Sequence, residues 1–190
     1  LGIAYQLQRE VDSAELYLGL SDSFLSHSFP KHNETVKAKS QLGALYSFTG
    51  DNEKSKTYYQ EALQLAKSTN YHYMIAYIQK ELAKLYFQMN EYETAAGFAK
   101  NSLALYESPD FDVKPQIHTA IELYTVLGNC YVNDSAHDAE PPLLKALELS
   151  RDLKDSQEIA IAETNYGNFL YEQNRFDEAL ALYTTSLKYF

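Results

Sequence analysis

The chain lacks tryptophan, has a single cysteine, and contains few of the residues that break helices. Seven glycines and five prolines in 190 residues are too few for the frequent turns of an all-β fold. Cys130, the only cysteine, cannot form a disulfide within the chain. No apolar run approaches the roughly 20 residues of a membrane-spanning helix. These absences exclude an all-β fold, an internal disulfide framework and membrane insertion by this segment.

Basic residues are also in deficit, with 16 Lys and Arg against 26 Asp and Glu. The formal net charge of -10 argues against direct nucleic-acid binding by this segment, because such binding needs a surface that neutralises phosphates. With 45% apolar residues, the chain can bury a substantial core, so a soluble, ordered protein is expected. We expect a cytoplasmic location, and an extracytoplasmic sensor region is the alternative.

Apolar residues recur at i, i+3, i+4 and i+7, which is typical of amphipathic helices. The sequence therefore predicts an all-α chain in which Asn33 and Ser156 are N-caps and Gly50, Asn90 and Asn174 lie in turns. The predicted helices cover 1–8 (a short stub), 11–26, 33–48, 52–67, 70–89, 92–106, a segment from beyond 115 to 132, a segment from 140, 156–173 and 176–190.

Small residues recur about every forty positions and define five repeats. They are Gly2, Gly43, Ala83, Gly128 and Gly167. An aromatic residue follows three positions later in four repeats (Tyr5, Tyr46, Tyr86, Tyr131), and Leu170 stands there in the fifth. Further small residues stand twelve and nineteen positions later, shifted by one in the fourth repeat: Ala14, Ser55, Ala95, Ala139 and Ala179, then Ser21, Ala62, Ser102, Ala146 and Ser186. Small side chains allow two helices to approach to about 8–10 Å, so the pattern predicts helical hairpins.

At Leu42-Gly43-x-x-Tyr46 and at Asn174-Arg175-Phe176-Asp177-Glu178-Ala179 the chain resembles the tetratricopeptide repeat superfamily. The long period is similar to that of Rap- and PlcR-type peptide receptors, kinesin light chains and bacterial sensor arrays. The resemblance implies a right-handed α-solenoid of about five helix-turn-helix hairpins. We expect one array over 1–190, with repeats at 1–29, 33–68, 70–108, 115–153 and 156–190 and the first hairpin truncated, as in a fragment of a longer protein. Tryptophan, part of the family pattern, is absent.

The resemblance also implies that the first helix of each hairpin lines a concave face. Exposed positions there are expected three before, one after and four after the small residue, which share one helical stripe. The positions are Ser40, Ala44 and Ser47; Lys80, Lys84 and Phe87; Thr125, Asn129 and Val132; and Thr164, Asn168 and Tyr171, with Gln41 and Asn165 beside the stripe. The predicted protein- or peptide-binding residues are Lys80, Lys84, Phe87, Thr125, Asn129, Thr164, Asn165, Asn168 and Tyr171. The alternative interpretation of this stripe is an ordinary solvated helix face.

Asn129 and Asn168 stand where the resemblance to Rap- and PlcR-type receptors implies contacts to a peptide backbone. Clamps that grip a C-terminal carboxylate have lysine and asparagine four residues apart on one helix. Here Lys80 is followed by Lys84, and Thr125 by Asn129, so the sequence does not reproduce that clamp.

No catalytic, cofactor-binding or metal-binding pattern is present. The five histidines, at 27, 32, 72, 118 and 137, lack metal-ligand spacing. Cys130 is expected to be a buried small hydrophobic residue rather than a nucleophile. We therefore expect no enzymatic activity, no cofactor and no metal site.

The sequence favours a non-catalytic module that binds a protein or peptide ligand on its concave face, as the sensory or scaffolding part of a regulatory or signalling protein. The alternative is a structural array that oligomerises through its terminal repeats or packs against other domains of its own chain. Leu182, Leu187, Tyr189 and Phe190 would then supply the apolar contacts at the C-terminal end.

Overall fold

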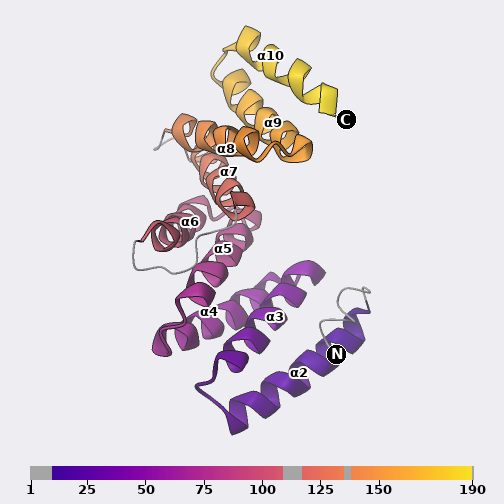
Figure 1. Ribbon diagram of the computed structural model, residues 1–190. Helices are drawn as coiled ribbons and strands as arrows, with labels where there is room; N and C mark the ends of the chain where they lie inside the picture. The colour runs from indigo at the N-terminus through magenta and orange to yellow at the C-terminus, as the bar shows by residue number, and fades with distance from the viewer. Residues whose placement is uncertain (1–9, 109–116, 135–137, 190) are drawn as a thin grey trace. The chain divides into compact units, whose positions relative to one another are not determined.

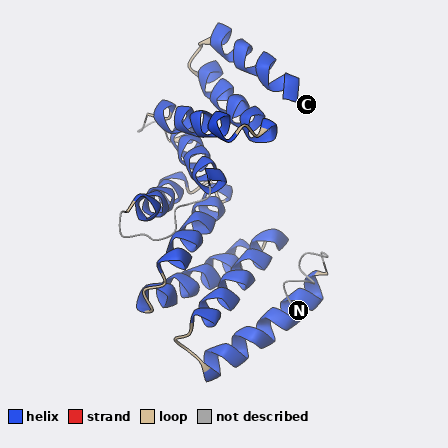
Figure 2. Cartoon of the chain, in the orientation of Figure 1, coloured by secondary structure: helices blue, strands red, loops and turns tan. Residues whose placement is uncertain are grey.

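The computed structural model (Figure 1) describes residues 10–108, 117–134 and 138–189. Within these ranges the chain forms helices and turns and contains no strand (Figure 2), which confirms the predicted all-α class. The predicted stub over 1–8 lies outside the described residues. The helices are α2 (Val11–Ser28), α3 (Asn33–Thr49), α4 (Asn52–Ser68), α5 (His72–Gln88), α6 (Tyr92–Glu107), α7 (Ile117–Asn133), α8 (Glu140–Leu153), α9 (Ser156–Glu172), α10 (Phe176–Ser186) and the 3-10 helix η1 (Leu187–Tyr189).

The chain divides into two compact units, and each is described by itself. Unit 1 is Leu1–Met89, in which α3 packs against α2, α4 and α5, and α4 also packs against α5. Unit 2 is Asn90–Phe190, in which α7 packs against α6, α8 and α9, and α9 packs against α8 and α10. By their register, α3, α5, α7 and α9 are first helices of hairpins, and α2, α4, α6, α8 and α10 are second helices.

The small residues lie where paired helices touch, as the spacing predicts. A Cβ atom on Gly43 would lie 2.8 Å from the Tyr59 ring, and one on Gly167 would lie 2.7 Å from the Tyr183 ring. Ser55, twelve positions after Gly43, is fully buried and donates a hydrogen bond of 2.8 Å from its Oγ to the Gly43 carbonyl oxygen. Side chains larger than hydrogen at these glycines would hold the helices apart.

The aromatic residue three positions later connects its helix to the preceding second helix. In unit 1, Tyr46 Oη donates to Glu15 Oε1 at 2.6 Å, and Tyr86 Oη accepts from Gln60 Nε2 at 3.1 Å. In unit 2, Lys100 makes a cation–π contact with Tyr131, and its Nζ lies 5.1 Å from the ring centroid. These tyrosines were predicted to be packing residues. The hydroxyls of Tyr46 and Tyr86 and the ring of Tyr131 also contact the preceding hairpin.

Left-handed backbone positions separate consecutive helices. Gly50 has φ 80°, and Asn90 and Asn174 have φ 60°, a region that glycine and asparagine adopt more readily than other residues. The three predicted turn residues are therefore confirmed. Asn70 also has a positive φ, 51°, which delays the start of α5 to His72.

Two predicted N-caps are wrong by one residue. His32 precedes α3 and accepts a hydrogen bond at Nδ1 from the Glu34 amide, and Asp155 precedes α9 and accepts from the amides of Gln157 and Glu158. The last helix was predicted to reach 190, but its α-helical part ends at Ser186. In both caps, the side chain just before the predicted residue supplies the acceptor for the free amides of the first turn.

Candidate functional site

First helices of successive hairpins lie side by side in each unit. In unit 1, α5 contacts α3, and in unit 2, α9 contacts α7. The nine predicted binding residues divide accordingly, with Lys80, Lys84 and Phe87 on α5 and the other six on α7 and α9. The structure therefore presents two sets of side chains, one in each unit.

In unit 2, Asn168 on α9 is exposed, and its amide is oriented by the neighbouring helix. Tyr183 Oη on α10 donates a hydrogen bond of 2.8 Å to Asn168 Oδ1. Burial raises the pKa of Tyr183, so its hydroxyl keeps the proton that it donates. Because Oδ1 is engaged, Asn168 can offer a ligand the two N–H donors of Nδ2.

Two other side chains of α9, those of Thr164 and Tyr171, offer a ligand an acceptor and an aromatic ring beside this donor. Thr164 Oγ1 donates its proton to the Ala160 carbonyl oxygen at 2.8 Å, so its lone pairs can accept from a ligand. Tyr171 is 60% exposed, and its ring lies edge-to-face with Phe176 at a centroid distance of 5.3 Å. The surface formed by α9 and the first residue of α10 thus combines an exposed amide donor, a half-buried hydroxyl acceptor and an aromatic pair.

The other predicted residues of unit 2 are half-buried, as Thr164 is. They are Thr125 and Asn129 on α7 and Asn165 on α9. The carbonyl oxygen of Asn129 accepts from Asn133 Nδ2 at 2.8 Å. Cys130, beside Asn129, is fully buried, and burial raises the pKa of its thiol to about 11, which disfavours the thiolate needed for nucleophilic chemistry.

In unit 1, the two predicted lysines share one carboxylate. Lys80 Nζ lies 2.9 Å from Glu81 Oε1, and Lys84 Nζ lies 3.6 Å from Glu81 Oε2. Lys80 Nζ also lies 5.4 Å from the centroid of the Tyr77 ring. An anionic ligand at this surface would therefore compete with Glu81 for both ammonium groups. Phe87, on the same helix, is half-buried.

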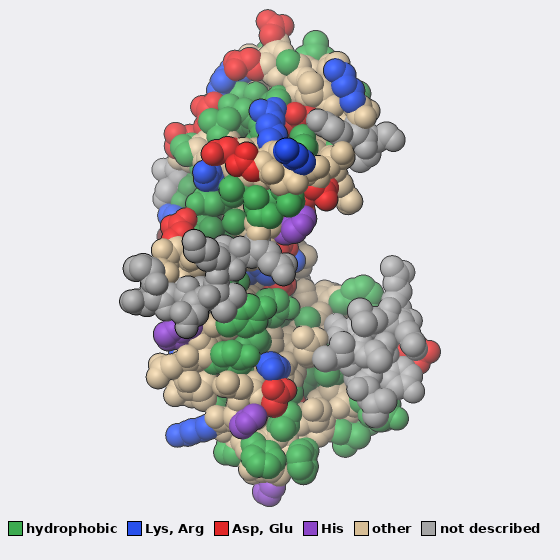
Figure 3. Space-filling model, in the orientation of Figure 1, with side chains coloured by type: hydrophobic (Ala, Val, Ile, Leu, Met, Phe, Trp, Pro, Cys, Tyr) green, Lys and Arg blue, Asp and Glu red, His purple; other side chains and the backbone are tan. Residues whose placement is uncertain are grey.

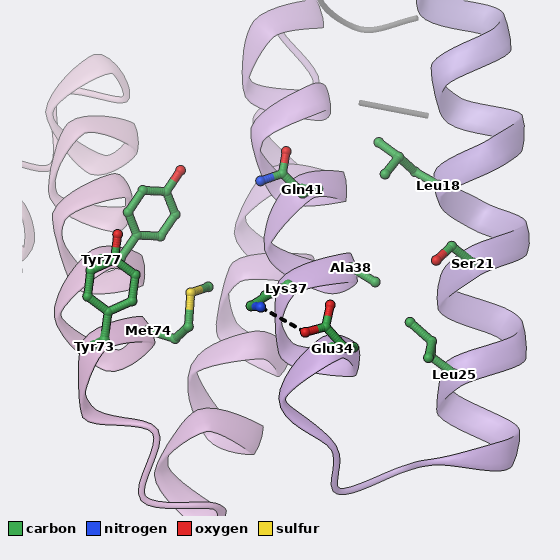
Figure 4. A pocket seen from close by; sticks show the side chains of 10 residues that line it. All are labelled: Leu18, Ser21, Leu25, Glu34, Lys37, Ala38, Gln41, Tyr73, Met74 and Tyr77. Carbon is green, nitrogen blue, oxygen red and sulfur yellow. Dashed lines mark hydrogen bonds and ion pairs between the residues drawn. The ribbon is translucent and has the colours of Figure 1, made fainter. Parts of the chain in front are cut away.

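Unit 1 also contains a cavity that the sequence did not predict, with a volume of about 420 Å³. In Figure 4, side chains of α2 and α5 extend toward α3 from its two sides. The lining residues are Leu18, Ser21, Leu25, Glu34, Lys37, Ala38, Gln41, Tyr73, Met74 and Tyr77. On α3, Glu34, Lys37 and Gln41 stand nine, six and two positions before Gly43. On α5, Met74 and Tyr77 stand nine and six positions before Ala83. Continuing the predicted stripe by further steps of three or four residues toward each N-terminus would have found them.

The prediction that Ser40 is exposed is wrong. Ser40 is 1% exposed, because α3 has α2, α4 and α5 as neighbours and its flanks are covered. The exposed edge of α3 is formed instead by Glu34 and Lys37, whose side chains form an ion pair of 2.7 Å.

Charged side chains in the described part of the chain form ion-pair and hydrogen-bond networks, such as that of Glu140 with Tyr166 and Arg175. There, no group of three or more His, Cys, Asp and Glu side chains is arranged to hold a metal ion. His118 Nδ1 on α7 lies 3.1 Å from Glu158 Oε1 on α9, a single exposed pair. None of the described helices has both the length and the apolar character to cross a membrane. On the face shown in Figure 3, basic side chains are interspersed with acidic ones.

Comparison with known proteins gives a family match over part of the chain. Residues 34–108 match the tetratricopeptide repeat family, and no curated protein sequence gives a significant match. Among solved structures, BtubC (BKLC) from P. vanneervenii is 21% identical, with 100% of this chain and 76% of that chain covered and a TM-score of 0.84. The apo form of RapI is 19% identical over 99% of this chain and 67% of that chain, with a TM-score of 0.84. A putative kinesin light chain with TPR-like repeats from Podosopora anserina is 14% identical over 99% and 90%, with a TM-score of 0.76. At these identities the likeness is one of fold.

Proposed function

Because the chain carries tetratricopeptide repeats in an all-α solenoid fold, we propose that it is a non-catalytic module that holds a protein or peptide ligand on its concave face. The fold is that of a protein-interaction module, and the repeat family is generally non-catalytic. The ligand, the signalling or scaffolding role, and the cytoplasmic location are parts of this proposal.

The observation that carries the proposal is the surface formed in unit 2 by α9 and the first residue of α10. Asn168, held by Tyr183, donates to a peptide carbonyl, and Thr164 accepts from a peptide N–H. The two residues are one helical turn, about 5.4 Å, apart, so neighbouring peptide groups of an extended segment can engage both. Tyr171 and Phe176 offer an aromatic surface to an adjacent side chain. Asn129 on α7 adds a further amide.

A test uses random dodecapeptides displayed on phage, selected on the full chain and resynthesised with a fluorescent label. Loss of two amide contacts in Asn129→Ala/Asn168→Ala should weaken the selected peptides by roughly tenfold or more, at about 0.5–1.5 kcal/mol for each contact. Asn101→Ala is the matched control, since Asn101 is exposed on the second helix α6 of the same unit. Equal affinity for the double variant and the control would refute the role of the amides, and failure to select any peptide would count against the function.

For unit 1, the proposal predicts selectivity toward acidic peptides at Lys80 and Lys84. Reversal of charge in Lys80→Glu places a second carboxylate beside Glu81 and should weaken acidic peptides more than neutral ones. Equal weakening of acidic and neutral peptides would show that the lysines do not discriminate between peptides by charge.

A second candidate function is self-association through α10 and η1. Leu180 and Leu187 are 64% and 71% exposed, and large exposed apolar side chains often mark protein interfaces. Sedimentation at increasing concentration tests this function. A dimer that Leu180→Gln/Leu187→Gln dissociates would support it. A monomer at about 100 μM, roughly a hundredfold above the Kd of an interaction worth about 8 kcal/mol, would exclude a dimer of that stability.

A further inference from the structure

The face of α9 that carries Thr164 and Asn168 also carries an exposed aliphatic residue that the sequence did not single out. Ile161 is 44% exposed and stands six positions before the small residue of its helix. In the other described first helices, that position is polar or carries a hydroxyl: Lys37 in α3, Tyr77 in α5 and Glu122 in α7. Because Ile161, Thr164 and Asn168 follow one another at intervals of three and four residues, they share one face of α9.

A second apolar contact lies at the other end of the same face. Tyr171 is 60% exposed and Phe176 is 52% exposed, and their rings meet edge to face at a centroid distance of 5.3 Å. Ile161 and Tyr171 are ten positions apart, which is about 15 Å along a helix. Thr164 and Asn168 lie between them. The two groups that can engage a peptide backbone are therefore flanked by an apolar contact on each side.

The separation of the two apolar contacts restricts the ligand that can reach both. An extended chain rises about 3.3 Å per residue, so about 15 Å corresponds to between four and five residues. Side chains four positions apart project to the same side of an extended chain, whereas side chains five positions apart project to opposite sides. A spacing of four therefore fits both contacts while the intervening backbone lies over the amide and the hydroxyl.

The charges on the first helices of unit 2 restrict the ligand further. The sequences of α7 and α9 contain no lysine or arginine. Glu158 stands three positions before Ile161, and its Oε1 lies 3.1 Å from Nδ1 of His118. Glu172 follows Tyr171 directly and is exposed. Carboxylates beside both apolar contacts favour a ligand with basic residues and repel one with acidic residues.

We propose that the ligand of α9 is an extended peptide with two apolar side chains four residues apart, accompanied by basic rather than acidic residues. One apolar side chain contacts Ile161 and the other contacts the rings of Tyr171 and Phe176. Ile161 is thereby a specificity-determining residue. The inference rests on the proposed function, because it takes Thr164 and Asn168 as the contacts to the peptide backbone.

The first test is a selection of random dodecapeptides, displayed on phage, on the full chain and in parallel on its Asn168→Ala variant. Sequences enriched only on the wild type are ligands of α9. We expect apolar pairs four positions apart to exceed pairs three or five apart, and Lys and Arg to exceed Asp and Glu. Wild-type-specific sequences without the four-residue spacing would overturn this inference alone. A complete lack of wild-type-specific sequences would refute the peptide site on α9 and this inference with it.

The second test locates the aliphatic contact with one selected peptide, resynthesised with fluorescein and followed by fluorescence anisotropy. Ile161→Gln should weaken binding about tenfold, because the peptide loses an apolar contact. Leu144→Gln is the matched control and should bind as the wild type does, since Leu144 is 43% exposed on the second helix α8 of the same unit. Thermal unfolding by circular dichroism verifies that both variants fold. Equal binding by the two variants would overturn the role of Ile161.

Two changes to the same peptide complete the test. A serine inserted between its two apolar residues should weaken binding to the wild type about tenfold, and should weaken binding to Ile161→Gln much less. Replacement of its Lys and Arg by Glu should weaken binding, and less so in Glu158→Gln/Glu172→Gln. An insertion that leaves the affinity unchanged would overturn the spacing, and equal affinity for the basic and acidic peptides would overturn the preference in charge.

Discussion

Gly128 offers a direct test of the packing that organises the repeats. A methyl group on Gly128 would place its carbon 2.5 Å from Leu143 Cγ and 2.6 Å from Leu143 Cδ2. Leu143 is 1% exposed, and Cγ is the branch point of the side chain, so the leucine cannot simply rotate away. Gly97 on α6, in the same unit, is the matched control, because an added Cβ there meets nothing within 4 Å.

The two substitutions should change stability in opposite directions. Alanine is favoured over glycine in a helix interior by about 1 kcal/mol, and this gain applies to both. At Gly128 the overlap adds an overpacking penalty of about 1–3 kcal/mol, because α7 and α8 must separate or Leu143 must leave its rotamer. We therefore expect Gly97→Ala to stabilise the protein by up to about 1 kcal/mol and Gly128→Ala to destabilise it by up to about 2 kcal/mol.

Urea unfolding followed by circular dichroism at 222 nm measures both effects, and thermal unfolding provides a second measurement. A change of 1 kcal/mol corresponds to a shift of roughly 2–4 °C in Tm for a chain of this size. If Gly128→Ala raises the midpoint as much as Gly97→Ala does, the close approach of α7 and α8 at this glycine is refuted.

Three further variants or treatments probe other parts of the fold. Gly50→Ala should destabilise the protein by about 1–2 kcal/mol, because alanine at φ 80° is strained; an unchanged urea midpoint would contradict this. The hydrogen bond from Tyr166, and then Arg175, lowers the pKa of Glu140, so its contribution to stability is present above the ordinary carboxyl pKa and is lost as pH falls through the folded-state value. Glu140→Gln should therefore lower Tm at pH 7 and reduce the loss of Tm on acidification to pH 3. Cys130, whose pKa burial raises to about 11, should react with an aromatic disulfide reagent at pH 8 only after unfolding, and rapid labelling of the native protein would contradict its burial.

The sequence predicts the joints of the hairpins well because their cause is local. Gly43 and Gly167 lie against Tyr59 and Tyr183, and a close helix contact admits few residue types, so the requirement is visible in residue identity alone. Turn residues are predictable for the same reason, since Asn174 at φ 60° reflects an intrinsic backbone preference. The N-caps were misplaced by one residue because several neighbouring polar side chains could serve, and the choice among them depends on backbone geometry.

The candidate surfaces were less predictable because they depend on which neighbours cover a helix. Ser40 and Lys80 stand at the same position of their repeats, yet Ser40 is buried and Lys80 is half-buried. The hydrogen-bond partners of polar side chains could not be predicted from the sequence either. Asn168 and Tyr183 are fifteen positions apart, and their hydrogen bond depends on side-chain rotamers that the spacing of residues does not specify. A periodic pattern therefore identifies a helix face, but the state of each group on that face follows from its neighbours.

At two junctions between hairpins, the residue four positions before the small residue forms an ion pair with the preceding second helix. In unit 1, Lys39 Nζ lies 3.3 Å from a carboxylate oxygen of Asp22 on the preceding second helix. In unit 2, Arg151 on the preceding second helix donates to Glu163 at 3.0 Å, and Glu163 is 3% exposed. The polarity of the contact is reversed between the two junctions. An exchanged junction would separate the buried Glu163 carboxylate from Arg151, and a buried charge without an opposite partner is strongly destabilising. The apolar and small residues make the hairpins alike, and the ion pair of Arg151 with Glu163 favours the native order of α8 and α9 over an exchanged one.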